Sequence, residues 1–390
     1  MLSISTLISR VFIFVIFWCY LVSTDLTDKG YSTDLIPLTR HLPTIISFII
    51  LLFYCFTRKV SLKLNKELFL MLSFFTFSII GASITVIYNN YDLENSFIGR
   101  SLSILTFFSA YFFVKNTSLK KLEKFAKVLF KLLIFYSIIY SLQIIYSSLT
   151  DTLIKSDSSK IIFHSNIVMF TSVLVLTIRS KNKAIKYFLT LLLVLTSLKI
   201  TKNTTYIVLI LTLTLPYFNK VKISRYKYLI KTVLFSFLII IALIYIYLWM
   251  TGIILPEGSR SVRFVTYTQR INEIIENPLV GKMFIGTPLI TLSWLLIPSH
   301  SDILDIISFG GVIGFILFAY PTFKIFKSFK FMTNFKFLYI KKITLFFYVS
   351  NICWFVIMMF NAPFANPRMI FFFWFGLGFI LALKHKKIIQ

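Results

Sequence analysis

Three arginines in one polar stretch have the spacing of a phosphate-binding helix face. The segment GSRSVRFVTYTQRINEIIE has helical periodicity, and Asn277-Pro278 is expected to end the helix directly after it. Arg263 and Arg270 then lie two turns apart on one face, and Arg260 lies one turn earlier. Because each guanidinium offers a two-pronged set of donors, the row is a candidate clamp for phosphate groups.

The same helix is amphipathic. The apolar side chains of one face are Phe264, Tyr267, Ile271 and Ile274. The side chains of a second, polar face are Arg263, Thr266, Arg270 and Glu273. We expect this helix to lie at a membrane surface, and a helix that merely rests on lipid headgroups is the alternative to a phosphate clamp.

One imidazole stands where this polar stretch meets the next apolar run. His300 has an unperturbed pKa near 6.5, which suits proton acceptance from a hydroxyl group at neutral pH. Ser301 and Asp302 follow it and are expected to cap the next helix. Asp305, one turn later, is either a partner of the arginine row or an ordinary interfacial carboxylate.

The elements that must hold these residues are membrane spans. The 390 residues are 57% hydrophobic and 14% charged, with a mean hydropathy of +0.84, which excludes a soluble globular chain. The excess comes in blocks long enough for a helix to cross about 30 Å of hydrocarbon. The predicted spans number twelve and lie near residues 7–23, 43–57, 68–88, 97–114, 125–147, 163–178, 187–200, 204–218, 232–250, 303–322, 343–360 and 369–383.

The charges orient these spans. If the N-terminus is cytoplasmic, the inner segments hold 29 of the 41 Lys and Arg residues but only two of the 14 acidic residues, Glu67 and Glu123. The whole net charge of +27 then lies on one side. This asymmetry is typical of a multi-pass protein with both termini in the cytoplasm, and it requires no nucleic-acid partner.

The fold expected is therefore an all-α polytopic membrane protein forming a single domain over residues 1–390. Its longest polar excursion, residues 251–302, lies on the outer side and is the expected functional loop. Arg100 lies at the outer boundary of its span, where a cation is either functional or extends to the headgroups. His41 and His385 are expected to be solvated, and the three cysteines to be reduced.

A resemblance enters through the order of these features. The arginine helix is followed by the turn NPLVG (277–281), then by His300-Ser301, nine residues, Gly311, two residues and Gly314. This order resembles the O-antigen ligase and polymerase superfamily, in which an arginine helix on the outer side precedes an N-P-hydrophobic-hydrophobic-G turn and an H-[NSQ]-nine residues-G-x-x-G segment.

The resemblance assigns roles to individual residues. Arg263, fourteen residues before Asn277, takes the place of the family arginine, and Tyr267 that of an aromatic residue often occupied by Trp. Asn166 in FHSNIVMF matches a family asparagine at the entry to a middle span. Lys202 in LKITKNTTYIVL stands near a second family arginine, so a point charge replaces a guanidinium there.

The resemblance implies a bacterial cytoplasmic (inner) membrane glycosyltransferase whose substrate is a polyprenyl-pyrophosphate-linked oligosaccharide. It would act on the outer face without metal or cofactor, with His300 and Arg263 catalytic. The residues that would bind pyrophosphate or sugar are Arg260, Arg270, Lys202, Arg100, Asn166 and Tyr267. Membrane lipid is a further partner, and a chain-length regulator and a flippase are candidate protein partners.

Three functions remain open at this point. We favour a polymerase of oligosaccharide repeat units for O-antigen (lipopolysaccharide), capsule or exopolysaccharide, because the match outside the motif loop is loose. A ligase that transfers O-antigen to lipid A core would share the donor chemistry. A flippase or secondary transporter is the alternative from another class, although transporters usually have duplicated halves and no duplication is visible here.

Overall fold

The computed structural model describes somewhat more than half of the chain, and all statements below concern these residues. They are residues 4–23, 36–57, 65–89, 97–150, 188, 191, 211, 259–282, 291–292, 295–296, 301–328, 336–359, 364 and 367–389. The helices are α1 (Ile4–Ser23), α2 (Ile36–Thr57), α3 (Lys66–Asn89), α4 (Phe97–Leu102), α5 (Leu105–Asn116), α6 (Leu119–Thr150), α11 (Ser259–Glu276), α12 (Asp302–Ser328), α13 (Leu338–Ile357) and α14 (Pro367–Ile389). The strands are β1 (Thr291–Leu292) and β2 (Leu295–Leu296), which pair antiparallel.

Eight of the twelve predicted spans fall on described residues, and each of them overlaps a helix. The segments long and apolar enough to cross a membrane are Lys66–Ile84, Phe97–Asn116, Asp302–Ser328 and Leu338–Ile357. The helical bundle is therefore that of a membrane protein. The predicted spans 163–178, 187–200, 204–218 and 232–250 lie outside the described residues, apart from three isolated positions.

One predicted span is broken. The segment 97–114 was expected to be one helix, but α4 ends at Leu102 and α5 begins at Leu105. The Ser103 hydroxyl donates to the carbonyl of Arg100 at 2.6 Å and accepts a 2.9 Å hydrogen bond from the Trp374 indole. The backbone nitrogens of Ser103 and Ile104 donate to the carbonyls three residues earlier, so the chain makes a tighter turn between the two helices.

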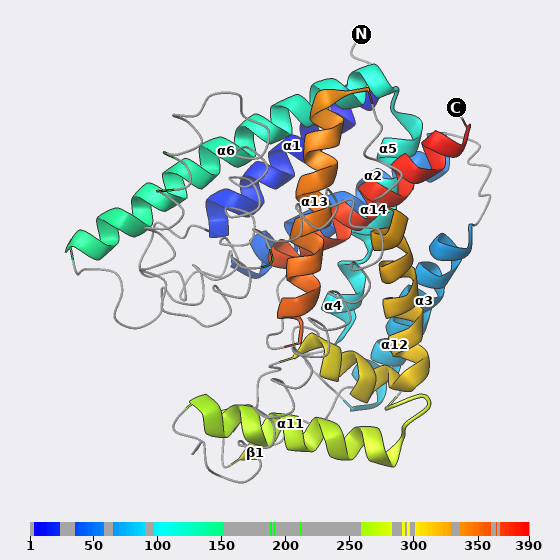
Figure 1. Cartoon of the computed structure of the whole chain (residues 1–390). Coiled ribbons are helices and arrows are strands. Elements are labelled where there is room, and N and C mark those ends of the chain that lie inside the picture. Colours follow the sequence, from blue (N-terminus) through cyan, green and yellow to red (C-terminus); the bar gives the residue numbers. More distant parts are fainter. Residues whose placement is uncertain are drawn as a thin grey trace, which may run out of the picture.

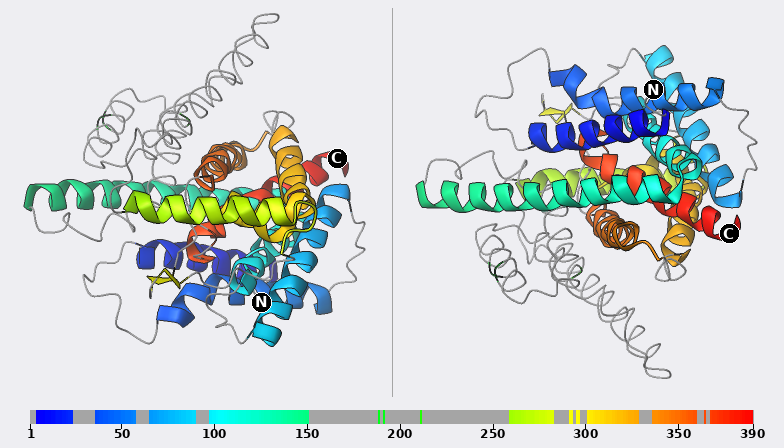
Figure 2. Two further views of the ribbon diagram at one scale, coloured as in Figure 1. Left: turned by 90° about the horizontal axis from the view of Figure 1, so that it is seen from below. Right: turned by 90° about the horizontal axis from the view of Figure 1, so that it is seen from above.

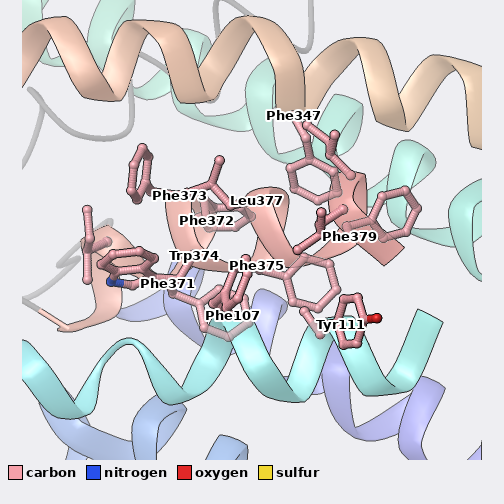
Figure 3. Close-up of a cluster of buried hydrophobic side chains, with 14 of the residues drawn as sticks. Phe107, Tyr111, Phe347, Phe371, Phe372, Phe373, Trp374, Phe375, Leu377 and Phe379 are labelled. Atoms are coloured by element: carbon pink, nitrogen blue, oxygen red, sulfur yellow. The ribbon is translucent and has the colours of Figure 1, made fainter. Parts of the chain in front are cut away.

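The most buried helix is α14, whose described side chains from Ile370 to Leu383 are all at most 4% exposed or glycine. Figure 3 shows its rings packed between α5 and α13, with Phe375 between Phe347 and Tyr111. A Cβ on Gly378 would collide with the Phe107 carbonyl, so α5 and α14 approach closely only because this position is glycine. In lipid such close packing, more than exclusion from water, holds helices together.

The helix ends divide into two groups. We call the first the tail end: it contains the starts of α1, α3, α6 and α13 and the ends of α5 and α14. There Lys121 bonds Ser5, Lys384 bonds Glu67, and the Lys386 ammonium donates to the Thr117 carbonyl. Figure 1 shows the start of α1 and the end of α14 together, as alternating spans with both termini on one side would place them.

We call the opposite group the α11 end. It consists of α4, α11, the start of α12, and the described residues Met358 and Phe364 between α13 and α14. Figure 1 shows α11 lying across this end, far from both chain ends. Figure 2 shows the same helix seen along the bundle. Two further predictions about histidines were wrong: His385 is 8% exposed at the tail end, and His41 lies inside α2, half-buried against α4.

Candidate functional site

The predicted helix of the outer loop forms, but its polar face points inward. It ends at Glu276, directly before Asn277-Pro278, as its sequence predicts. Arg270 is 7% exposed and Glu273 is 3% exposed, whereas Ile271 on the apolar face is 47% exposed. Of the predicted polar face, the described side chains of Thr266, Arg270 and Glu273 are therefore buried, and Arg270 and Glu273 bond residues of α12.

This inversion has an electrostatic cause. The first turn of α12 carries Asp302 and Asp305, both about 1% exposed, and two cations are needed to balance them. Arg270 donates from Nε to Oδ1 of Asp305 at 2.8 Å, and Arg100 donates from Nη1 to Oδ2 at 2.7 Å. One carboxylate therefore bridges two guanidiniums that are 170 residues apart in the sequence. A buried carboxylate is stable only when it is paired in this way.

Glu273 fastens α11 to α12 a second time. Its carboxylate accepts from Arg270 Nη1 at 3.1 Å and from the Ser308 hydroxyl, and the Lys282 ammonium lies 3.7 Å away. Gln269, on the preceding turn, donates to the same carboxylate at 2.9 Å. Arg270 is thus held by two acids on two helices, and its guanidinium also lies 4.7 Å from the centre of the Phe309 ring.

The turn NPLVG and the glycines of α12 form one backbone unit. The main-chain nitrogens of Val312 and Ile313 donate to the carbonyls of Pro278 and Leu279 at 2.9 and 3.1 Å. In return, the Lys282 nitrogen donates to the Ser308 carbonyl at 3.1 Å. The turn therefore occupies a gap in the hydrogen-bond ladder of α12.

Two glycines make this docking possible. Gly281 and Gly311 have φ angles of 58° and 61°, in the region where a side chain is strained. A Cβ on Gly281 would lie 2.5 Å from the Ser308 carbonyl oxygen, and one on Gly311 would collide with the Leu279 carbonyl. The helix is consequently interrupted at Gly311, which has a ψ of −165°.

The start of α12 is fixed to the connection between α13 and α14. Ser301 caps α12 by accepting from the Leu304 nitrogen at 3.2 Å, as predicted, and its hydroxyl donates to the Met358 carbonyl at 3.1 Å. Asp302 does not cap its own helix. Its Oδ2 accepts from the Phe364 nitrogen at 2.7 Å, while its Oδ1 faces Arg100 Nη1 at 3.8 Å.

The ion pairs between α4, α11, α12 and Lys282 form one cluster, in which positive and negative charges are equal in number. It contains three cations, Arg100, Arg270 and Lys282, and three carboxylates, Glu273, Asp302 and Asp305. Such a network fixes side-chain directions, because moving any member leaves a charge unpaired in a medium of low dielectric. In the described part of the chain, no three His, Cys, Asp or Glu side chains are arranged to hold a metal ion.

The structure brings some of the predicted site residues together. Arg100 and Arg270 meet on Asp305, and Tyr267 lies half-buried one turn before Arg270. Arg260 and Arg263 belong to α11, and the structure describes their backbone but not their side chains. The residues that lie wholly outside it are His300, Lys202 and Asn166.

Sequence reasoning missed several members of the cluster. It left open whether Asp305 pairs with the arginine row or is an ordinary interfacial carboxylate, it did not connect Arg100 with Asp305, and it left Lys282 unmentioned. The spacing Arg270–Glu273 was a usable signal, since residues three apart in a helix are neighbours. His41 was also missed as a neighbour: its Cε1 lies 3.4 Å from the position of a Cβ on Gly99, next to Arg100.

Comparison with protein-family models and with curated proteins gave no match for this chain. The assignment of function therefore rests on the sequence motif and on the geometry of the α11 end.

Proposed function

We propose that this chain polymerises lipid-linked oligosaccharide repeat units by metal-independent glycosyl transfer. The donor would be a polyprenyl-pyrophosphate-linked oligosaccharide on the outer face of the bacterial cytoplasmic membrane. The product would be O-antigen, capsule or exopolysaccharide.

The observation that carries the proposal is the docking of NPLVG on the glycines of α12. These two parts of the motif are about thirty residues apart, and four backbone groups of Pro278, Leu279, Val312 and Ile313 join them. Hydrogen bonds between these parts explain why a turn ending in glycine and a glycine in the following span occur together. The resemblance to the superfamily is thus supported by contact between the two motif parts as well as by their spacing in the sequence.

The second support is the fixed placement of α11. Arg270 anchors this helix to Asp305 of α12, and helical periodicity assigns Arg263 to the same side of α11, about 10 Å away along its axis. We therefore assign Arg270 and Arg100 to holding the site, and Arg263 with Arg260 to contacting the pyrophosphate. Preorganised cations of this kind lower a barrier because they need no rearrangement during the reaction.

The proposed step balances as a simple displacement. The acceptor hydroxyl oxygen forms a bond to the anomeric carbon, and the bond from that carbon to the pyrophosphate oxygen breaks. His300 takes the hydroxyl proton, and the arginines stabilise the charge that develops on the departing polyprenyl pyrophosphate. Tyr267, Lys202 and Asn166 are the remaining candidates for sugar or phosphate contact.

Loss of the gene tests the proposal through surface polysaccharide resolved on a gel. We expect single repeat units attached to core, or no polymer where the product is a capsule. Core alone, with long lipid-linked chains, would indicate a ligase instead. Repeat units held on the inner leaflet would indicate a flippase, and an unchanged ladder would contradict all three functions.

Two substitutions test the residue roles in the complemented strain. His300→Ala should abolish chain extension at normal membrane abundance, because the hydroxyl proton loses its acceptor. Arg263→Lys should shorten or remove the ladder, since an ammonium cannot grip phosphate with two parallel bonds. Full activity of either variant would remove that residue from the mechanism, and Lys327→Arg, in the last turn of α12, is the control for a charge-conserving change.

A further inference from the structure

A row of lysines at the tail end suggests a second binding site. The start of α6 carries five exposed lysines, and they are Lys120, Lys121, Lys124, Lys127 and Lys131. Glu123 is the one acid among them, and both its oxygens accept backbone hydrogen bonds, from Tyr339 at 2.9 Å and Ile340 at 2.8 Å. This acid fixes the start of α13, and the charge of the row stays strongly positive.

Two ammonium groups converge on one ring beside this row. Lys127 Nζ lies 5.8 Å and Lys342 Nζ 5.3 Å from the centre of the Tyr339 ring, and Lys342 also lies 4.8 Å from that of Phe130. Each cation gains from the face of the ring, and both ammonium groups add to the positive charge beside the row.

The same face of α6 becomes apolar further along. Val128, Phe135 and Leu142 follow one another at steps of seven residues and are 43%, 59% and 54% exposed. Val128 and Phe135 lie one turn after Lys124 and Lys131 respectively, so charged and apolar side chains share one stripe. A ligand that follows this stripe must have an anionic head and an apolar body.

We propose that the start of α6, together with the first turn of α13, binds an anionic phospholipid. Its phosphate would lie among Lys124, Lys127, Lys131 and Lys342, near Tyr339, and its acyl chains would run along Phe135 and Leu142. Tyrosine suits this depth because its ring is amphipathic. Free phosphate shares the headgroup chemistry, but the exposed apolar stripe favours the lipid.

A second group of lysines, on α3 and α12, provides a matched control. Lys66 and Lys324 both approach the ring of Tyr320, at 5.5 and 5.4 Å, and Lys327 lies exposed one turn later. This second cluster also pairs two lysines with one tyrosine, but it lacks the long row of α6. Removing three exposed lysines from either cluster changes the net charge equally.

The experiment uses the full chain in phosphatidylcholine nanodiscs that contain increasing amounts of phosphatidylglycerol, with bound lipid counted by native mass spectrometry. The unsubstituted protein should retain phosphatidylglycerol in preference to phosphatidylcholine. The triple variant Lys124→Gln, Lys127→Gln, Lys131→Gln should bind it about tenfold to hundredfold more weakly, given the attraction of each lysine to an anionic surface. The triple variant Lys66→Gln, Lys324→Gln, Lys327→Gln should bind it within about threefold of the parent.

Each other outcome overturns the site. Equal losses in both triple variants would mean that lipid follows net charge alone. Displacement of the lipid by millimolar inorganic phosphate would mean that the anion, not the lipid, is recognised. If the unsubstituted protein showed no preference for phosphatidylglycerol, the proposed site would be refuted by that measurement alone. None of these results bears on glycosyl transfer.

Discussion

The two ends of the bundle handle charge in opposite ways. At the α11 end, three cations and three carboxylates from four segments share one balanced cluster, in which Asp305 serves two arginines at once. At the tail end, the described acids are few and separate: Glu67 pairs with Lys384 at 2.6 Å, and Glu123 accepts hydrogen bonds from two backbone nitrogens of α13. The lysines around them are mostly exposed.

The two arrangements of charge have different physical consequences. Lysines in excess at one end of a bundle orient it in a membrane, and no fixed geometry is needed for that. A balanced, buried cluster contributes little to orientation, and its formation costs desolvation energy that only accurate pairing repays. The α11 end has this second form, and its cluster fixes α11 and the NPLVG turn on α12.

The largest expected effect comes from removing the shared carboxylate. Asp305→Asn should leave Arg100 and Arg270 buried without their common partner, at a cost of about 3–5 kcal/mol in the free energy of unfolding. Glu67→Gln at the tail end makes the same chemical change in a pair whose side chains are 24% and 15% exposed. We expect it to cost at most about 1 kcal/mol.

Unfolding of the purified proteins in one detergent measures the contrast directly. Equal destabilisation by the two amide substitutions would show that the α11 end is no more ordered than the tail end. Asp305→Asn should also reduce polymer length, whereas Glu67→Gln should leave it unchanged.

A smaller effect is expected from the backbone docking. Gly311→Ala forces a side chain into a positive φ and against the Leu279 carbonyl, so the NPLVG turn should lose its place at a cost of about 2–3 kcal/mol. Gly99→Ala is the matched control at the same end, because its Cβ would meet only His41, at 3.4 Å. Proteolysis after α11 should quicken in the first variant only, and a normal rate there would argue against the turn as a fixed part of the site.

Much of this fold could be predicted from sequence, since each predicted span that falls on described residues overlaps a helix, and periodicity located α11 with its end before Asn277. The sequence could not predict which face of α11 packs on the bundle. An outward polar face is the usual arrangement, and it was reversed here by Asp302 and Asp305, which lie more than 25 residues further along the chain. Pattern within one helix cannot reveal a partner on another.

The site shows the same limit. Arg100 was recognised as a cation at a span boundary, but its pairing with Asp305 depends on how α4 packs on α12, which no local pattern encodes. The glycines differ from Arg100, because their spacing in the motif identifies them from the sequence. Their role, which is to admit the NPLVG turn into the hydrogen-bond ladder of α12, follows only from the structure.

The smallest expected effect is a pH dependence that arises at the tail end, from His385. His385 lies beyond the predicted span 369–383, and its ring nitrogens lie 2.9 and 3.1 Å from the Asn65 amide nitrogen. An amide NH2 can only donate, so the bonded imidazole nitrogen must accept. Burial lowers the pKa of His385, and the nearby Lys384 and Lys115 lower it further, although Glu67 opposes them.

The sign of the effect follows from this lowered pKa. The unfolded chain has a histidine pKa near 6.5 and binds the proton more readily than the folded chain. The contribution of His385 to stability is therefore complete above about pH 6.5 and is lost as the pH falls through the lower, folded-state pKa. The cations bridged by Asp305 are guanidiniums, which stay protonated throughout this range, so that bridge keeps its positive charges. Unfolding midpoints from pH 7.5 to pH 5 should thus decline for the unsubstituted protein and decline less for His385→Gln, and an identical decline in both would assign the titration to a group other than His385.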